Sequence, residues 1–196
     1  MVHRHRVQNC FAAHRAIMDT VERELSQVIA EVAALLVDVF RGGGKLLVMG
    51  NGGSAADAQH FAAELVGRFL MERRALPAIA LSTDTSILTA VGNDYGFASV
   101  FRRQVEALAA KGDVVMGIST SGSSPNVLEA LRRAREMGCR TVVLLGRDGG
   151  AIRGVTDLDL TVPVRDTPRI QEAHIAIIHI LCELVEQGLY GDACTP

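Results

Sequence analysis

The sequence predicts an α/β fold built on a parallel sheet. Short apolar segments that are typical of buried strands alternate with longer segments of helical periodicity, which is the pattern of a parallel sheet covered by helices. Of the 196 residues, 48% are hydrophobic and 21% are charged, as in a globular chain rather than a disordered one. Because no linker or low-complexity stretch interrupts the pattern, we expect one domain.

Each expected strand is a short apolar run bounded by turn residues. The strands are residues 45–50, 77–81, 113–119, 140–146 and 157–163, and the last is the weakest. The helices expected between and after them are residues 54–70, 85–93, 97–110, 124–138 and 167–189. The end of the chain, GDACTP, is expected to fray.

A helical segment, residues 8–40, precedes the first strand. Apolar side chains recur in it at spacings of three and four, and the glycines of RGGGK end it. The periodicity does not distinguish one bent helix from two. Two roles are open for this arm, since it could cover the core of its own chain or pack against a partner subunit.

The composition argues against nucleic-acid and membrane partners. Aromatic residues make up 4%, Trp is absent and the net charge is -2, so the chain lacks both stacking platforms and a basic surface. No segment is long and apolar enough to span a bilayer, and no signal peptide is visible. The four cysteines lack a paired spacing, which argues against a zinc–thiolate site. We therefore expect a cytoplasmic protein.

The loop after the first strand resembles a nucleotide fingerprint only in part. GNGGSAA fits the pattern G-x-G-x-x-A at Gly50, Gly52 and Ala55. A dinucleotide site also needs an acidic residue at the end of the second strand, and Asp84 lies later than expected. The P-loop pattern is absent as well. This loop is therefore a candidate ligand loop without a dinucleotide assignment.

The loop after the third strand, ISTSGSSPN, is rich in hydroxyl groups. Hydroxyls and the N-terminus of the following helix together suit a terminal phosphate without Lys or Arg. The alternative is an N-cap with a serine-rich turn, which one or two serines would satisfy. The number of hydroxyls favours anion binding; they belong to Ser119, Thr120, Ser121, Ser123 and Ser124.

Two pairs of polar residues lie on separate expected helices. His60 and Glu64 are four residues apart and share one helix face, where the alternative is a surface ion pair or a buried histidine. On the last helix Gln171 and His179 are about 80° apart at about 100° per residue, so both can face one point. His174 is about 140° from His179 and is expected to pack or to hydrogen-bond instead. The four residues form a candidate zinc site, although glutamine is an uncommon ligand.

Four segments of the sequence, in order, closely resemble the phosphoheptose isomerases, which are sugar isomerase (SIS) domain enzymes. The segments are GNGGSAADAQHFAAEL, TAVGNDYGF, GDVVMGISTSGSSPNVL and DTPRIQEAHIAIIHILCELVE. The resemblance implies a single SIS domain over residues 1–196, with a helical arm at 1–43 and an α/β core at 44–190. It implies a three-layer, flavodoxin-like sandwich around a five-stranded parallel sheet, assembled as a homotetramer.

The implied reaction converts sedoheptulose 7-phosphate to D-glycero-D-manno-heptose 7-phosphate. This is the first step of bacterial ADP- and GDP-heptose synthesis, which supplies lipopolysaccharide core among other glycans. The resemblance assigns one zinc ion per subunit to the metal ligands His60, Glu64, Gln171 and His179. It assigns substrate binding to Asn51, Gly52, Gly53, Ser54, Glu64, Asn93, Asp94, Ser119, Thr120, Ser121, Ser124 and Gln171.

An aldose–ketose isomerase must move a proton between neighbouring carbons through an enediolate. We expect Glu64 to act as the base and His179 as the opposing acid/base, with zinc as a Lewis acid. Another class of function exists in the same fold, namely a catalytically inactive adaptor that binds the bacterial replication initiator. Such an adaptor is free to lose the carboxylate and the second histidine, and this chain keeps both.

Overall fold

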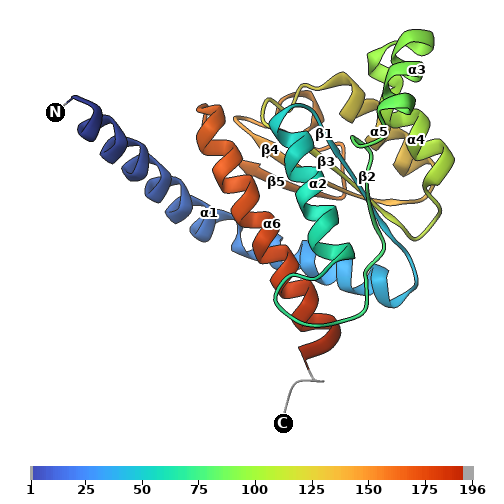
Figure 1. Ribbon diagram of the computed structural model, residues 1–196, viewed down its shortest axis with the longest axis horizontal. Helices are drawn as coiled ribbons and strands as arrows, with labels where there is room; N and C mark the ends of the chain where they lie inside the picture. The colour runs from blue at the N-terminus through green and yellow to red at the C-terminus, as the bar shows by residue number, and fades with distance from the viewer. Residues whose placement is uncertain (1, 192–196) are drawn as a thin grey trace.

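The computed structural model describes residues 2–191 as an α/β sandwich with a long N-terminal helix (Figure 1). The strands are β1 (Leu46–Gly50), β2 (Ala78–Ala80), β3 (Val114–Ser119), β4 (Arg140–Gly146) and β5 (Leu158–Val162). The α-helices are α1 (Val2–Arg41), α2 (Gly53–Val66), α3 (Thr85–Tyr95), α4 (Val100–Leu108), α5 (Pro125–Glu136) and α6 (Thr167–Tyr190). Two 3₁₀ turns complete the described elements, η1 (Phe97–Ser99) and η2 (Gly150–Ile152).

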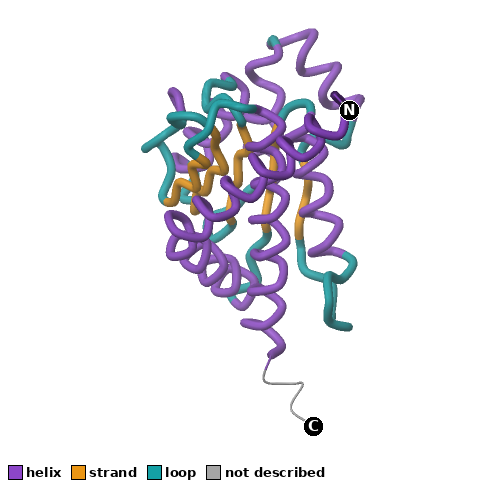
Figure 2. The backbone as a smooth tube through the Cα atoms, turned by 90° about the vertical axis from the view of Figure 1, so that its left-hand side faces the viewer, coloured by secondary structure: helices purple, strands orange, loops and turns teal. Residues whose placement is uncertain are grey.

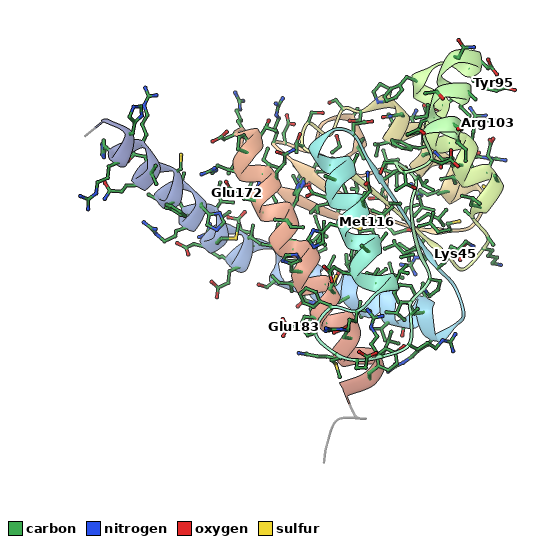
Figure 3. The ribbon with its side chains drawn as sticks, viewed as in Figure 1. Lys45, Tyr95, Arg103, Met116, Glu172 and Glu183 are labelled. Carbon is green, nitrogen blue, oxygen red and sulfur yellow. The ribbon has the colours of Figure 1, made fainter. Side chains whose placement is uncertain are left out.

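The strands form one parallel sheet in the order β2-β1-β3-β4-β5. The central strand β3 is buried along its whole length, and Met116 lies near its middle (Figure 3). Since all strands run the same way, the loops that follow β1 and β3 leave the same edge of the sheet side by side. Ligands of open α/β sheets bind at this carboxyl edge, and both candidate loops of the sequence lie there.

Helices cover both faces of the sheet, as the side view in Figure 2 shows. One hydrophobic cluster joins the sheet to α1, α2 and α6, with Phe61 and Ile177 among its fully buried members. The other joins it to α4 and α5, with Phe101 and Leu131 fully buried. The predicted three-layer arrangement around five parallel strands is therefore confirmed.

The N-terminal arm is one continuous helix, α1. From Ile17 to Val37 its apolar face is part of the core and packs along α6, so this half covers the chain's own core. The first part of α1 projects from the body (Figure 1), and Val7 and Phe11 are 54% and 61% exposed there. Of the two roles left open for the arm, covering the chain's own core is therefore shown for its second half.

The helix expected over residues 54–70 was predicted too long, because α2 ends at Val66. The backbone N–H groups of Phe69, Leu70 and Met71 donate to the carboxylate of Glu186 on α6 instead of continuing the helix. The helix is capped at Gly67, and Glu186, far away in the sequence, binds the N–H groups of the segment that follows. The fraying expected of GDACTP concerns residues that, apart from Gly191, lie outside those the structure describes.

The remaining boundaries differ by small amounts. The helix expected at 85–93 continues to Tyr95, and the one expected at 97–110 divides into η1 and α4. None of the helices formed by residues 2–191 combines the length and apolar character needed to cross a membrane.

Candidate active site

The glycines between β1 and α2 let the backbone lie close to Ser54 on α2 and to Gln171 on α6. A Cβ at Gly50 would lie 2.5 Å from the carbonyl oxygen of Ser54, and one at Gly53 would lie 2.1 Å from Nε2 of Gln171. Gly52 has a positive φ of 54°, which favours glycine. The loop therefore needs glycines to bring α2 against the start of α6.

The glycine loop is joined to the hydroxyl-rich loop by a reciprocal amide pair. Asn51 donates to Oδ1 of Asn126, and Asn126 donates back to Oδ1 of Asn51, each at 2.9 Å. Asn126 is almost fully buried at the start of α5 and also accepts the N–H of Val127. This pair holds the two candidate ligand loops at a fixed separation.

The hydroxyl-rich loop folds into a tight cradle ahead of α5. The hydroxyl oxygens of Ser119 and Ser124 lie 2.9 Å apart, and Ser121 accepts the N–H of Ser123 at 3.2 Å. Gly122 has a φ of 64°, and a Cβ there would lie 2.0 Å from the carbonyl oxygen of Gly149. Hydroxyls and N–H groups thus gather at the N-terminus of a helix, where a positive dipole end favours anions.

Helices α2 and α6 bring polar side chains together along their lengths. On α2, Nε2 of His60 lies 3.1 Å from a carboxylate oxygen of Glu64. Nε2 of His179 on α6 lies 3.3 Å from Nε2 of His60, although 119 residues separate them in the sequence. Phe69 packs beside the His179 ring. Two imidazoles and a carboxylate therefore converge from two helices.

Gln171 lies about two turns before His179 on α6, with its amide against Gly53. A hollow of about 430 Å³ is lined by Gln171 and by His60, which connects this amide to the imidazole cluster. A larger hollow of about 720 Å³ lies beside Ser121, next to Arg147 and Arg165, and does not include the cluster.

Within residues 2–191 no three His, Cys, Asp or Glu side chains are already arranged around one metal position. Two separations nevertheless lie near those expected between ligands of one zinc ion. A tetrahedral zinc ion with ligands at about 2.0–2.2 Å separates its ligand atoms by about 3.3–3.6 Å. The distances of 3.1 and 3.3 Å between the His60, Glu64 and His179 atoms lie close to that span. The donor set of nitrogen and oxygen also suits zinc.

Comparison with known proteins gives the family. The model of the SIS domain family matches residues 10–146. The phosphoheptose isomerase of Geobacter metallireducens is 70% identical over 178 residues, which cover 91% of this chain and 94% of that protein. The chain belongs to the phosphoheptose isomerase family. The phosphoheptose isomerase of Geobacter sulfurreducens is 71% identical over the same shares.

Solved structures of the family have the same fold. The phosphoheptose isomerase GmhA of Neisseria gonorrhoeae superposes with a TM-score of 0.88 at 46% identity, covering 94% of this chain and 98% of that one. A phosphoheptose isomerase of Francisella tularensis gives 0.92 at 38% identity, covering 95% and 100%. The similarity therefore extends over nearly the whole chain, the α1 arm included.

Within one chain, two expected substrate residues lie away from the cluster. Asn93 and Asp94 are exposed near the end of α3, where Nδ2 of Asn93 donates to Asp94 at 2.8 Å. α3 packs against η1 and α4, and Figure 1 shows it well apart from α6. Their place in substrate binding stays a prediction.

Asp57 is a half-buried carboxylate that the sequence analysis did not single out. It lies one turn before His60 on α2 and lines the same 430 Å³ hollow. Burial raises the pKa of Asp57 to about 6, although the nearby His60 opposes the shift. Its Oδ2 has no hydrogen-bond partner among the described residues. The spacing of three residues from His60 was a signal that could have identified it.

His174 lies apart from the cluster, as the helical geometry predicts. It is fully buried, and its Nε2 lies 3.0 Å from the carbonyl oxygen of Leu145, to which the neutral ring donates. Burial lowers the pKa of His174 to about 4, while the hydrogen bond to Leu145 opposes the shift. The folded state therefore holds fewer protons than the unfolded state between pH 4 and 6.5, the ordinary value for histidine.

This shift predicts a loss of stability in acid. The contribution of His174 is complete above pH 6.5 and is lost as the pH falls towards 4, about 3 kcal/mol in all. Urea denaturation of the metal-free chain at several pH values measures it. A His174→Gln variant, which keeps an N–H donor, should lack this part of the pH dependence. If the free energy of unfolding changed with pH in the same way in the parent and in the variant, His174 would not be the cause of the acid destabilisation.

Proposed function

We propose that this chain converts sedoheptulose 7-phosphate to D-glycero-D-manno-heptose 7-phosphate, the first step of bacterial ADP- and GDP-heptose synthesis. The observation that carries the proposal is the convergence of His60, Glu64 and His179 from two helices, in a chain that also forms the cradle of Ser119 and Ser124. Relatives at about 70% identity over most of the chain carry the name phosphoheptose isomerase, which supports the same reaction.

The reaction needs a proton acceptor on one side of the reacting carbons and a proton donor on the other. In the proposal, Glu64 removes the C–H proton beside the carbonyl group, and its carboxylate is part-exposed to a ligand. His179 exchanges the proton of the substrate hydroxyl from the opposite helix. In the proposal the sugar occupies the hollow that residues of α2 and α6 line beside His60.

Zinc is part of the proposal and would be held by His60, Glu64, Gln171 and His179. When bound there, it supplies Lewis-acid stabilisation of the negative charge that develops on the substrate oxygens. A carboxylate that binds zinc tightly is a weaker base, so Glu64 would exchange between metal and substrate.

The phosphate of the substrate would be bound in the serine cradle, with Ser54, Ser121 and Thr120 contributing. Ser54 is buried at the start of α2, directly after the glycine loop. The backbone of Asn51, Gly52 and Gly53 would contact the sugar. Binding the phosphate fixes the position of the reacting carbons, and part of the binding energy therefore accelerates the reaction.

Removing one cradle hydroxyl should weaken catalysis. A Ser124→Ala variant loses a hydrogen bond to a charged group, so kcat/KM for the sugar phosphate should fall about 10- to 100-fold. Ser26→Ala is the control, because Ser26 is exposed on α1 and outside this loop. Steady-state kinetics of the two variants measure the difference. Equal kcat/KM values for the two variants would exclude a role of Ser124 in phosphate binding.

The adaptor function is not favoured. An adaptor has no need of the contacts among His60, Glu64 and His179, which the chain forms from two separate helices. A cytoplasmic location belongs to the same proposal as the isomerase, because the substrate is a phosphorylated metabolite of the cytoplasm.

A homotetramer also belongs to the proposal. Val7 and Phe11 on α1 have exposed apolar side chains. They line a hollow of about 580 Å³ together with Arg169 and Glu172 of α6. Glu172 is also bound to His14 at 2.8 Å, so this surface of the arm lies against the start of α6 (Figure 3). Size-exclusion chromatography with light scattering gives the number of subunits.

The function is tested by incubating the purified, zinc-loaded chain with sedoheptulose 7-phosphate in D₂O. NMR spectroscopy should detect an aldose 7-phosphate that carries solvent deuterium at the carbon beside the new aldehyde. An unchanged ketose at high protein concentration would contradict the proposed function.

A further inference from the structure

A buried ion pair lies close to the site and outside the set of groups that contact the substrate in the proposed function. Nε of Arg73 lies 2.9 Å from Oε1 of Glu186, and both side chains are 1% exposed. Arg73 is in the loop after α2, whereas Glu186 is near the end of α6. The pair therefore joins the two helices that supply the imidazoles and the carboxylate.

Arg73 binds the end of α2. Its guanidinium donates to the carbonyl oxygens of Glu64 at 2.9 Å and Leu65 at 2.7 Å, and more weakly to that of Gly67 at 3.4 Å. The last carbonyl groups of a helix have no partner within it, so its last turn frays unless something else binds them. Glu64 lies in this turn, and Arg73 is what fixes its backbone.

Glu186 fixes Arg73 and the loop between them. Besides Arg73 it accepts the backbone N–H groups of Phe69, Leu70 and Met71 at 2.8–2.9 Å. Burial alone would raise the pKa of Glu186, but these N–H groups and the guanidinium hold it below its usual range. The carboxylate is therefore charged and fully hydrogen-bonded, which makes it a rigid anchor.

Glu186 lies on the same face of α6 as His179. Glu186 follows His179 by seven residues, which is about two helical turns, so both lie on one face of α6. Between them on the helix, the pKa of the Cys182 thiol is raised to about 12, first by burial and then by the carboxylates of Glu64 and Glu186. The anchor, the catalytic carboxylate and the imidazole therefore share one contact region between α2 and α6.

We propose that Arg73 and Glu186 are positioning residues, whose ion pair fixes the rotation and spacing of α2 against α6 so that the His60–Glu64 pair on α2 meets His179 on α6. The inference rests on the proposed isomerase function for its kinetic consequence. An error of about 1 Å in the placement of a catalytic group can cost about 100-fold in rate. The two residues act through Glu64 and do not contact the substrate.

The chain contains a matched control on other elements of the fold. Lys45 and Asp113 form an ion pair at 2.6 Å just before β1 and β3, and Asp113 is 4% exposed. Asp113 also accepts the backbone N–H groups of Lys45 and Ala110. This pair resembles Arg73–Glu186 in its bonds but joins the segments just before β1 and β3 and does not bind α2 or α6.

The test compares Arg73→Lys and Glu186→Gln with Asp113→Asn, each verified as folded by circular dichroism. Arg73→Lys keeps the positive charge but loses the planar guanidinium, whose several N–H groups bind the carbonyl oxygens. We expect kcat to fall about tenfold or more in both Arg73→Lys and Glu186→Gln, with KM within about threefold of the parent. Asp113→Asn should lower the melting temperature without lowering kcat more than about twofold.

Hydrogen exchange supplies a readout that needs neither substrate nor metal. The amides in the last turn of α2 should exchange at least about tenfold faster in Arg73→Lys and should be unchanged in Asp113→Asn. The inference would be overturned if the amides of this turn exchanged in Arg73→Lys as in the parent. It would also be overturned if the parent were active and kcat were unchanged in both Arg73→Lys and Glu186→Gln. If the parent shows no turnover, the proposed function fails while the exchange measurement still decides the role of the pair.

Discussion

A Glu64→Gln variant is expected to fold like the parent chain and to lose about 10²–10⁴-fold in kcat. The amide has nearly the shape of the carboxylate but cannot accept a proton. His179→Asn should lose activity by a similar factor, because it removes the opposing acid/base from α6. Neither change creates a large cavity, since His60 and Glu64 are 44% and 27% exposed and His179 is part-exposed beside them. Steady-state turnover of sedoheptulose 7-phosphate measures both effects.

Two exposed residues provide controls of the same chemistry. Glu72, whose side chain is 92% exposed, gives the control Glu72→Gln, and His5 on the projecting part of α1 gives His5→Asn. Both controls should retain full activity. Full activity in Glu64→Gln or in His179→Asn would exclude that residue from the mechanism.

Removal of metal is expected to have an effect of comparable size. Dialysis against a chelator should lower kcat by at least about 100-fold, and added zinc should restore it, because the proposed site stabilises the charge on the enediolate. Turnover before and after zinc is returned, with metal content measured in parallel, tests this. The parent should contain about one zinc per chain.

A variant distinguishes a catalytic metal from a contaminant. His60→Ala removes one proposed ligand and should lower zinc content and turnover together, while the α2 backbone remains helical. A chelated chain with undiminished activity and no detectable metal would contradict the zinc assignment and leave the assignment of Glu64 and His179 to be tested alone.

The sheet was predictable because its signals are local. A parallel strand buried on both faces is a continuous apolar run, and β4 matches the expected residues 140–146 at both ends. That Gln171 and His179 both face α2 also followed from local geometry, because positions eight apart on a helix lie near one face. The same geometry separated His174, which is buried against Leu145.

The contacts that position the site were not predictable in this way. Arg73 and Glu186 are 113 residues apart, and each alone resembles an ordinary surface charge in the sequence. Glu186 also binds the N–H groups of the segment after α2, where the helix was expected to continue to residue 70. Asn126 was missed for a similar reason, since its partner Asn51 lies 75 residues away. The length of α1 was not fixed by periodicity, because bent and continuous helices have the same pattern.

The most direct test of the central claim is the X-ray absorption spectrum of zinc bound to the purified chain and to His179→Asn. The parent should show two imidazole ligands with oxygen donors at about 2.0–2.2 Å, and the variant should lose one imidazole. That result would place α2 and α6 around a common ion. A spectrum that His179→Asn leaves unchanged would mean that the two helices do not share a metal, contradicting the account of the site.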